Sequence, residues 1–115
     1  MAFGTRAAFE AVRELAFGSI TTNYAAVGTA LTDHARIVII NNTTDKDVYF
    51  SLDGVIDHLR VAAGGFKLLD VTSNKVQDDG NFFRIGTIFS VKQTSAGAPS
   101  SGLVWVEVCY SQGGV

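Results

Sequence analysis

Two carboxylates and an imidazole lie close together between residues 53 and 58. Asp53, Asp57 and His58 are residue types that ligate metal ions or exchange protons in general acid–base catalysis. A structural explanation accounts for them equally well: Asp53 precedes Gly54 in a dipeptide typical of tight hairpin turns, and the other two follow on the returning strand. Because no second histidine cluster accompanies them, the sequence favours the structural explanation. We expect no metal site and no catalytic residue here.

Two acidic segments resemble calcium-binding loops in composition. They are Asp45-Lys46-Asp47 and Asp78-Asp79-Gly80-Asn81. Neither has the five spaced oxygen ligands and the terminal glutamate of an EF-hand loop. The glycine pair Gly64-Gly65 is likewise not followed by the lysine and hydroxyl residue of a phosphate-binding loop. The sequence therefore predicts no cofactor.

Cys109 is the single cysteine, and His34 or His58 would be its partner in a catalytic pair. It lies within the most apolar segment of the chain, where a free cysteine behaves as a small hydrophobic residue. Burial there would raise the pKa of the thiol and oppose nucleophilic reactivity. The residues thus do not identify an enzyme, and we expect none.

Four aromatic residues leave a second hypothesis open. Tyr24, Tyr49, Trp105 and Tyr110 could line a sugar-binding face on a β-sandwich, or pack in a core like the phenylalanines. A module that binds a glycan of a host surface therefore remains the alternative function.

The elements that position these residues change in character near residue 33. Residues 5–17 are rich in helix formers, with Ala8, Val12, Leu15 and Ala16 on one helical face, and Gly18 is a natural stop. The spacing predicts a short N-terminal helix. Residues 18–32 are rich in Thr, Ala and Gly, a composition that favours an extended arm or an edge strand.

From residue 35 onward, short β-branched or aromatic runs alternate with turn residues, the rhythm of an all-β fold. The predicted strands include residues 36–40, 48–52, 66–71 and 103–110. The last is apolar on both faces except at Glu107, so we expect it to be central or to lie against a partner. We predict a single antiparallel β-sandwich, jelly-roll-like or immunoglobulin-like, at residues 33–115, preceded by the helix and arm at residues 1–32. Residues 94–102 form the longest polar loop.

Composition limits the partners. The chain has 115 residues, with 47% hydrophobic and only 17% charged residues and a formal charge of −2. Soluble domains usually contain about 25% charged residues, so part of this surface is expected to lie against other chains. Near-neutral charge argues against nucleic-acid binding, and no apolar run is long enough to span a membrane.

Six segments, taken in their order along the chain, resemble a group of small virion proteins of tailed bacteriophages. These segments are Leu15-Ala16-Phe17-Gly18-Ser19-Ile20, Tyr24-Ala25-Ala26-Val27-Gly28, Asn42-Thr43-Thr44-Asp45, Ser51-Leu52-Asp53-Gly54-Val55-Ile56-Asp57-His58, Leu69-Asp70-Val71-Thr72-Ser73-Asn74-Lys75 and Gly86-Thr87-Ile88-Phe89-Ser90-Val91-Lys92. The resemblance runs from about residue 14 to residue 110. It implies a non-enzymatic structural β-sandwich present in many copies in the particle.

These expectations combine into one hypothesis. The chain is expected to be a homo-oligomeric virion protein at the head–tail junction or on the capsid shell, with copies of itself and capsid, portal or tail proteins as partners. Aromatic and aliphatic anchors carry most of the energy of an interface. The predicted contact residues are Leu15, Phe17, Ile20, Tyr24 and Trp105.

Overall fold

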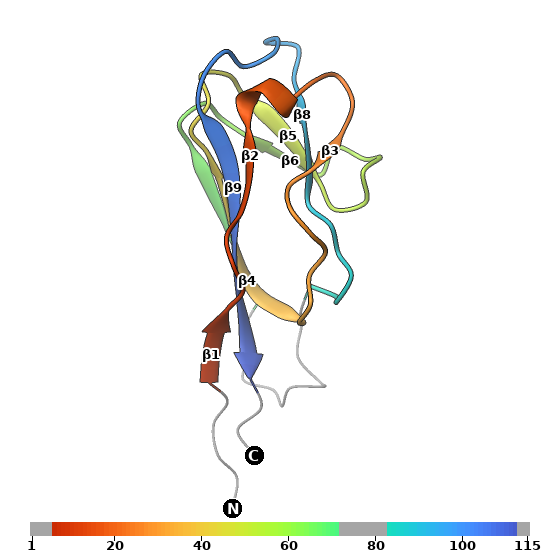
Figure 1. The fold of residues 1–115 in the computed structure, drawn as a ribbon, viewed down its shortest axis with the longest axis vertical. Helices are drawn as coiled ribbons and strands as arrows, with labels where there is room; N and C mark the ends of the chain where they lie inside the picture. Colours follow the sequence, from red (N-terminus) through yellow and green to blue (C-terminus); the bar gives the residue numbers. More distant parts are fainter. Residues whose placement is uncertain (1–5, 72–82, 113–115) are drawn as a thin grey trace, which may run out of the picture.

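The structure, a computed structural model, describes residues 6–71 and 83–112 and contains two antiparallel sheets (Figure 1). The first sheet contains, in spatial order, β1 (Arg6–Phe9), β9 (Leu103–Gln112), β4 (Ala35–Asn42) and β7 (Phe66–Asp70), and β2 (Arg13–Ala16) also pairs with β9. The second sheet contains β3 (Ala25–Ala26), β8 (Ser90–Gln93), β5 (Val48–Ser51) and β6 (Leu59–Val61). The prediction of an all-β fold is confirmed. Within the described residues, no helix has the length and apolar character needed to cross a membrane.

One hydrophobic core joins the two sheets. Alternate residues of β4 and β9 are fully buried and face the second sheet, because side chains of a strand alternate between its two faces. They meet buried residues of β5, β6 and β8. The largest fully buried side chains include Phe50, Phe89, Ile40, Val106 and Val91.

Strand β9 is central in the first sheet, as its apolar sequence predicted. It pairs with β4 on one side and with β1 and β2 on the other. Figure 1 shows that β1 and the end of β9 extend beyond the second sheet. The backbone groups of β9 are therefore satisfied on both sides, which suits a strand whose two faces are apolar.

The prediction of an N-terminal helix is wrong. Within residues 6–17 the chain forms the strands β1 and β2, and the nearest helical element is one 3-10 turn at Phe17–Ser19. A helix of about a dozen residues is marginal in water, so its local preference is easily outweighed. Here pairing with β9 satisfies the backbone groups, and the segment around Gly28 covers the buried side chain of Arg13.

A β-bulge separates β1 from β2. Phe9 lies opposite Cys109 and Arg13 lies opposite Val106, so residues 10–12 face only residues 107 and 108 of β9. In a regular strand, residues three apart point to opposite faces. The extra residue lets Glu10 and Arg13 point to the same side of the strand.

Residues 18–32 cross from the first sheet to the second. Ile20, Val27 and Leu31 are buried in the common core, and β3 is an edge strand paired with β8. Gly28 passes directly over Arg13 with a φ of +73°, and a Cβ at this position would lie 2.7 Å from the Cβ of Arg13. The close approach of these two segments therefore requires glycine.

Substitution of Gly28 tests this approach. Gly28→Ala should lower the free energy of unfolding by about 3 kcal/mol or more, because it adds a steric clash to the cost of about 1–2 kcal/mol for a left-handed alanine. Gly54→Ala is the matched control, since Gly54 has a φ of +76° with no atom within 4 Å of the added Cβ. Urea unfolding measures both variants. Equal losses in the two variants would show that the approach to Arg13 imposes no constraint.

Candidate functional site

Asp53 caps the turn between β5 and β6. Its Oδ1 accepts hydrogen bonds from the backbone N–H groups of Ile56 (3.0 Å) and Val55 (2.8 Å) and from the hydroxyl of Ser51 (2.8 Å). These hydrogen bonds lower the pKa of Asp53 to about 2, and the bond from Ile56 contributes most to this shift. The carboxylate therefore acts as an acceptor that holds the turn, and Gly54 next to it has the positive φ that the sequence predicted for this turn.

Asp57 and His58 lie in the connection before β6, not on the returning strand as expected, and both are bound by other groups. Asp57 accepts a hydrogen bond from the hydroxyl of Tyr24 and lies 3.0 Å from Nζ of Lys92, and these two contacts lower its pKa. Burial and the hydrogen bond to Asp57 together raise the pKa of Tyr24. His58 accepts the N–H of Leu52 at Nδ1 (3.1 Å). Among the described residues, no group of three or more His, Cys, Asp or Glu side chains is arranged to hold a metal ion.

The first acidic segment also connects loops. Asp45 accepts hydrogen bonds from the N–H (2.8 Å) and the hydroxyl (2.5 Å) of Ser100, and so attaches the loop at residues 94–102. Asp47 accepts hydrogen bonds from Arg60 (2.8 Å) and from the N–H of Ala63 (2.9 Å). The second acidic segment, residues 78–81, lies outside the described residues.

The four aromatic residues of the sugar-binding hypothesis do not share one face. Tyr24 and Tyr49 lie beside the second sheet with Nζ of Lys92 at 4.9 Å and 5.9 Å from their ring centroids. Trp105 and Tyr110 belong to β9 of the first sheet, where Nε1 of Trp105 donates a hydrogen bond to Glu107 (2.7 Å). Cys109, on the same strand, is a buried free thiol.

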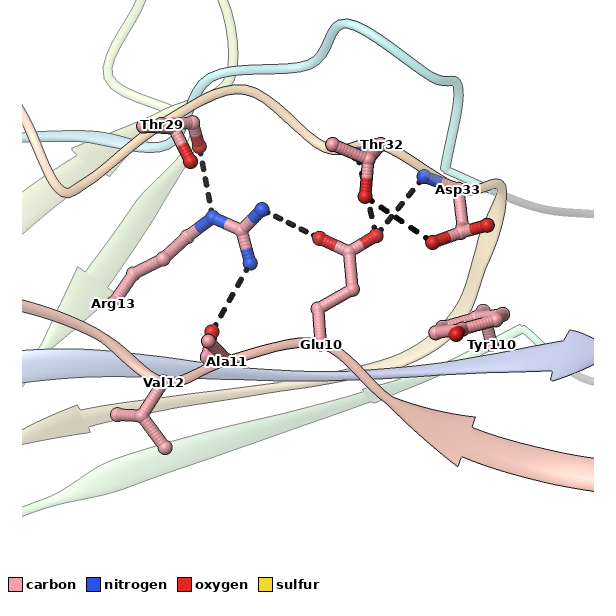
Figure 2. Close-up of a pocket in the computed structure, with 8 residues that line it drawn as sticks. All are labelled: Glu10, Ala11, Val12, Arg13, Thr29, Thr32, Asp33 and Tyr110. Carbon is pink, nitrogen blue, oxygen red and sulfur yellow. Dashed lines mark hydrogen bonds and ion pairs between the residues drawn. The ribbon is translucent and has the colours of Figure 1, made fainter.

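A shallow pocket of about 330 Å³ lies at the bulge between β1 and β2 (Figure 2). Figure 2 shows the side chains of Glu10 and Arg13 pointing toward each other beneath the segment at residues 29–33, while Val12 points away from them. Both charged side chains are only 6% exposed. The sequence did not predict this pair, although its spacing of three residues is visible there.

The charged groups of this pocket are bound to one another and to the backbone. Arg13 donates hydrogen bonds to Glu10 and to the carbonyl oxygens of Thr29 (2.8 Å) and Ala30 (3.1 Å). The other carboxylate oxygen of Glu10 accepts the N–H groups of Thr32 (3.2 Å) and Asp33 (2.9 Å). The pocket therefore contains a satisfied structural network that connects the bulge to the segment at residues 29–33.

Burial raises the pKa of Glu10, but the hydrogen bonds and the charge of Arg13 outweigh burial. The net pKa of Glu10 thus lies below its ordinary value of 4.5. A carboxylate that is held ionised in the folded state stabilises the fold above the unfolded pKa. This contribution is lost as the pH falls through the folded pKa.

The side of the first sheet that faces away from the core is a further surface with exposed apolar side chains. We call it the outer face. By register and alternation it contains Phe9, Ile37, Ile39, Phe66, Leu68 and Trp105. Phe9 and Phe66 are 67% and 66% exposed. Its charged residues in β2, β9 and β7 are the acidic Glu14, Glu107 and Asp70.

The predicted contact residues are distributed over several environments. Trp105 is half-buried on the outer face, and Phe17 is exposed in the 3-10 turn. Leu15 and Tyr24 are half-buried, and Leu15 packs against the core. Ile20 is 2% exposed and belongs to the core itself.

The sequence contains a signal for the outer face. Residues 37–40 form a continuous apolar run, a pattern typical of a strand that is buried on both sides. In the structure the core side of β4 is buried, whereas Ile37 and Ile39 on the outer face are half-buried. The apolar run therefore indicates both faces of β4, although among the described residues only the core face is covered by a second sheet.

Comparison with known proteins adds no assignment. No protein-family model, curated protein or solved structure matches the chain. The resemblance to small phage virion proteins stays a prediction.

Acid unfolding tests the role of Glu10. The free energy of unfolding of the unaltered chain should fall as the pH decreases from about 5 through the lowered pKa of Glu10. Glu10→Gln should be less stable at pH 7 by about 1–3 kcal/mol, because Arg13 loses its charged partner, and should depend less on pH below 5. Urea unfolding at each pH measures this.

The matched control is Glu14→Gln, which alters an exposed glutamate of the neighbouring strand. It should change stability at pH 7 by less than about 0.5 kcal/mol and retain the loss in acid. If Glu10→Gln and Glu14→Gln have superimposable pH profiles, the buried pair contributes nothing to stability.

Proposed function

We propose that the chain is a non-enzymatic structural protein, present in many copies in the virion of a tailed bacteriophage. Its outer face is buried there against neighbouring proteins, at the head–tail junction or on the capsid shell. The observation that carries the proposal is the apolar outer face, with Phe9 and Phe66 about two-thirds exposed. Antiparallel sheets that face water normally have polar residues on that side.

The proposed architecture is a single β-sandwich. The stretch from β4 to β5 runs antiparallel to the stretch from β8 to β9, and both stretches cross from one sheet to the other. This nested pairing favours a jelly-roll-like arrangement over an immunoglobulin-like one. Such a two-layer fold leaves one face of each sheet available for neighbours in an assembly.

The polar clusters support a structural role more than a catalytic one. Asp53, Asp57 and Glu10 each accept hydrogen bonds that hold a turn or connect two segments. Their lowered pKa values keep them ionised as acceptors, whereas a general acid needs a pKa near the working pH.

Charge indicates which partners suit the outer face. Glu14 and Glu107 are acidic and lie on adjacent strands of this face. A partner that buries it should offer apolar side chains with basic residues around them, because opposite charges favour encounter and like charges oppose it. Trp105, hydrogen-bonded to Glu107, lies between these charges and is the aromatic anchor that we assign to the contact.

Particle association tests the proposal. When phage particles are sedimented from an infected culture, the chain should sediment with them in a fixed ratio to the capsid protein. Phe9→Lys, which alters the outer face, should reduce incorporation at least about tenfold, because truncated aromatic anchors commonly cost 2 kcal/mol or more.

Val55→Lys is the matched control, because Val55 is 77% exposed in the turn between β5 and β6. It should be incorporated normally. Circular dichroism confirms that both variants fold. A chain that stays in the supernatant, or equal incorporation of the two variants, would contradict the proposal.

A further inference from the structure

We propose that two copies of this chain pair through β7, edge to edge and antiparallel, around a twofold axis at Leu68. The inference rests on the proposed function and deepens it, because it names the first partner in the assembly as a second copy of the chain. It follows from the edges of the two sheets, the hydrogen-bond pattern of β7 and the groove beside it.

The four sheet edges differ in their suitability for pairing. β3 has two residues and β6 has three, and Arg60 of β6 is ion-paired with Asp47 at 2.8 Å. The edge formed by β1 and β2 is interrupted by the bulge at residues 10–12. β7 has five residues in continuous register with β4, and no other strand of the described residues pairs with it. Long regular edges are those that accept another strand.

The hydrogen bonds show which residues of β7 direct their backbone groups toward β4 and which direct them away from it. The N–H of Val71 donates to the carbonyl of Arg36 (2.9 Å), and the N–H of Asn42 donates to the carbonyl of Gly65 (2.9 Å). Hydrogen-bonding direction alternates along an antiparallel strand, so the odd-numbered residues bond to β4. Leu68 and Phe66 therefore direct their N–H and C=O groups away from β4.

A twofold axis at Leu68 pairs the outward backbone groups of this residue. Leu68 of one copy lies opposite Leu68 of the other, as a hydrogen-bonded pair. Lys67 lies opposite Leu69, so no like charges face each other across the new pair.

An apolar groove beside β7 adds burial to this pairing. The groove has a volume of about 460 Å³, and Leu52, Leu59, Leu69 and Phe83 contribute to its lining. A second β7 extends the first sheet over the groove and places its inward side chains at the opening. Leu68 is 56% exposed in the single chain, and it would meet its counterpart on the outer face.

Two substitutions at Leu68 separate backbone pairing from side-chain burial. Proline removes an N–H that points away from β4, and edge strands tolerate proline at such positions. Leu68→Thr keeps this N–H and removes apolar surface. By analytical ultracentrifugation, the unaltered chain at about 100 μM should be dimeric. Leu68→Pro should be monomeric, and Leu68→Thr should dimerise with an affinity within about tenfold of the original.

A cross-link tests the register without weakening the strand. In a Cys109→Ala background, the Cα atoms of two Leu68→Cys residues would be about 5.5 Å apart, within reach of a disulfide. Two Phe66→Cys residues would be offset by about 14 Å along the strands and serve as the control. Oxidation should link the Leu68→Cys chains at least about tenfold more than the Phe66→Cys chains.

Several outcomes would overturn the inference. They are a monomeric unaltered chain at about 100 μM, equal loss of dimer in Leu68→Pro and Leu68→Thr, and equal cross-linking at positions 66 and 68. A chain that is monomeric but still sediments with particles would overturn pairing through β7 and leave the proposed function intact. A cross-linked dimer that stays out of particles would overturn the proposed function and leave pairing through β7 intact.

Discussion

The buried ion pair between Glu10 and Arg13 is the interaction on which the N-terminal part of the structure depends. It lies where one extra residue interrupts the pairing with β9, and it binds the backbone at residues 29–33. Burial of two charges has a desolvation cost, which their attraction offsets only when further hydrogen bonds satisfy both groups. Here these bonds come from the backbone of Thr29, Ala30, Thr32 and Asp33. The pair thus ties the edge of the first sheet to the segment that leads into β4.

This connection explains why the segment around residues 6–16 can be extended although its residues favour a helix. A spacing of three residues between opposite charges is also typical of a helical surface, where the pair would be exposed and weak. In the structure the same pair is buried by Gly28 and its neighbours. Local propensity contributes a few tenths of a kcal/mol per residue, which strand pairing and this network exceed.

Sequence patterns predicted much of the remaining fold for related reasons. Strands β4, β5, β7 and β9 have strong apolar runs bounded by turn residues. Gly54 has the positive φ expected of its turn, but the connection extends over residues 52–58 and is not the tight hairpin that the Asp53-Gly54 dipeptide predicted. The partners of those runs were not predictable, because an apolar run looks the same whether its second face meets its own chain or another. The sequence therefore could not show that Ile20, a predicted contact residue, lies in the core, or that Phe66 and Leu68 lie on the outer face.

The two surfaces that we assign to contacts are compatible with each other because they use different directions of the same sheet. Edge pairing at β7 forms hydrogen bonds within the plane of the sheet, whereas burial of the outer face acts perpendicular to it. A pair joined at β7 would keep Glu14 and Glu107 on strands away from its axis, since β4 and β9 separate β2 from β7. The doubled face would then have Glu14 and Glu107 on both flanks, and Asp70 of each copy close to its centre. Acidic groups at these positions favour a partner that combines apolar contact with basic residues.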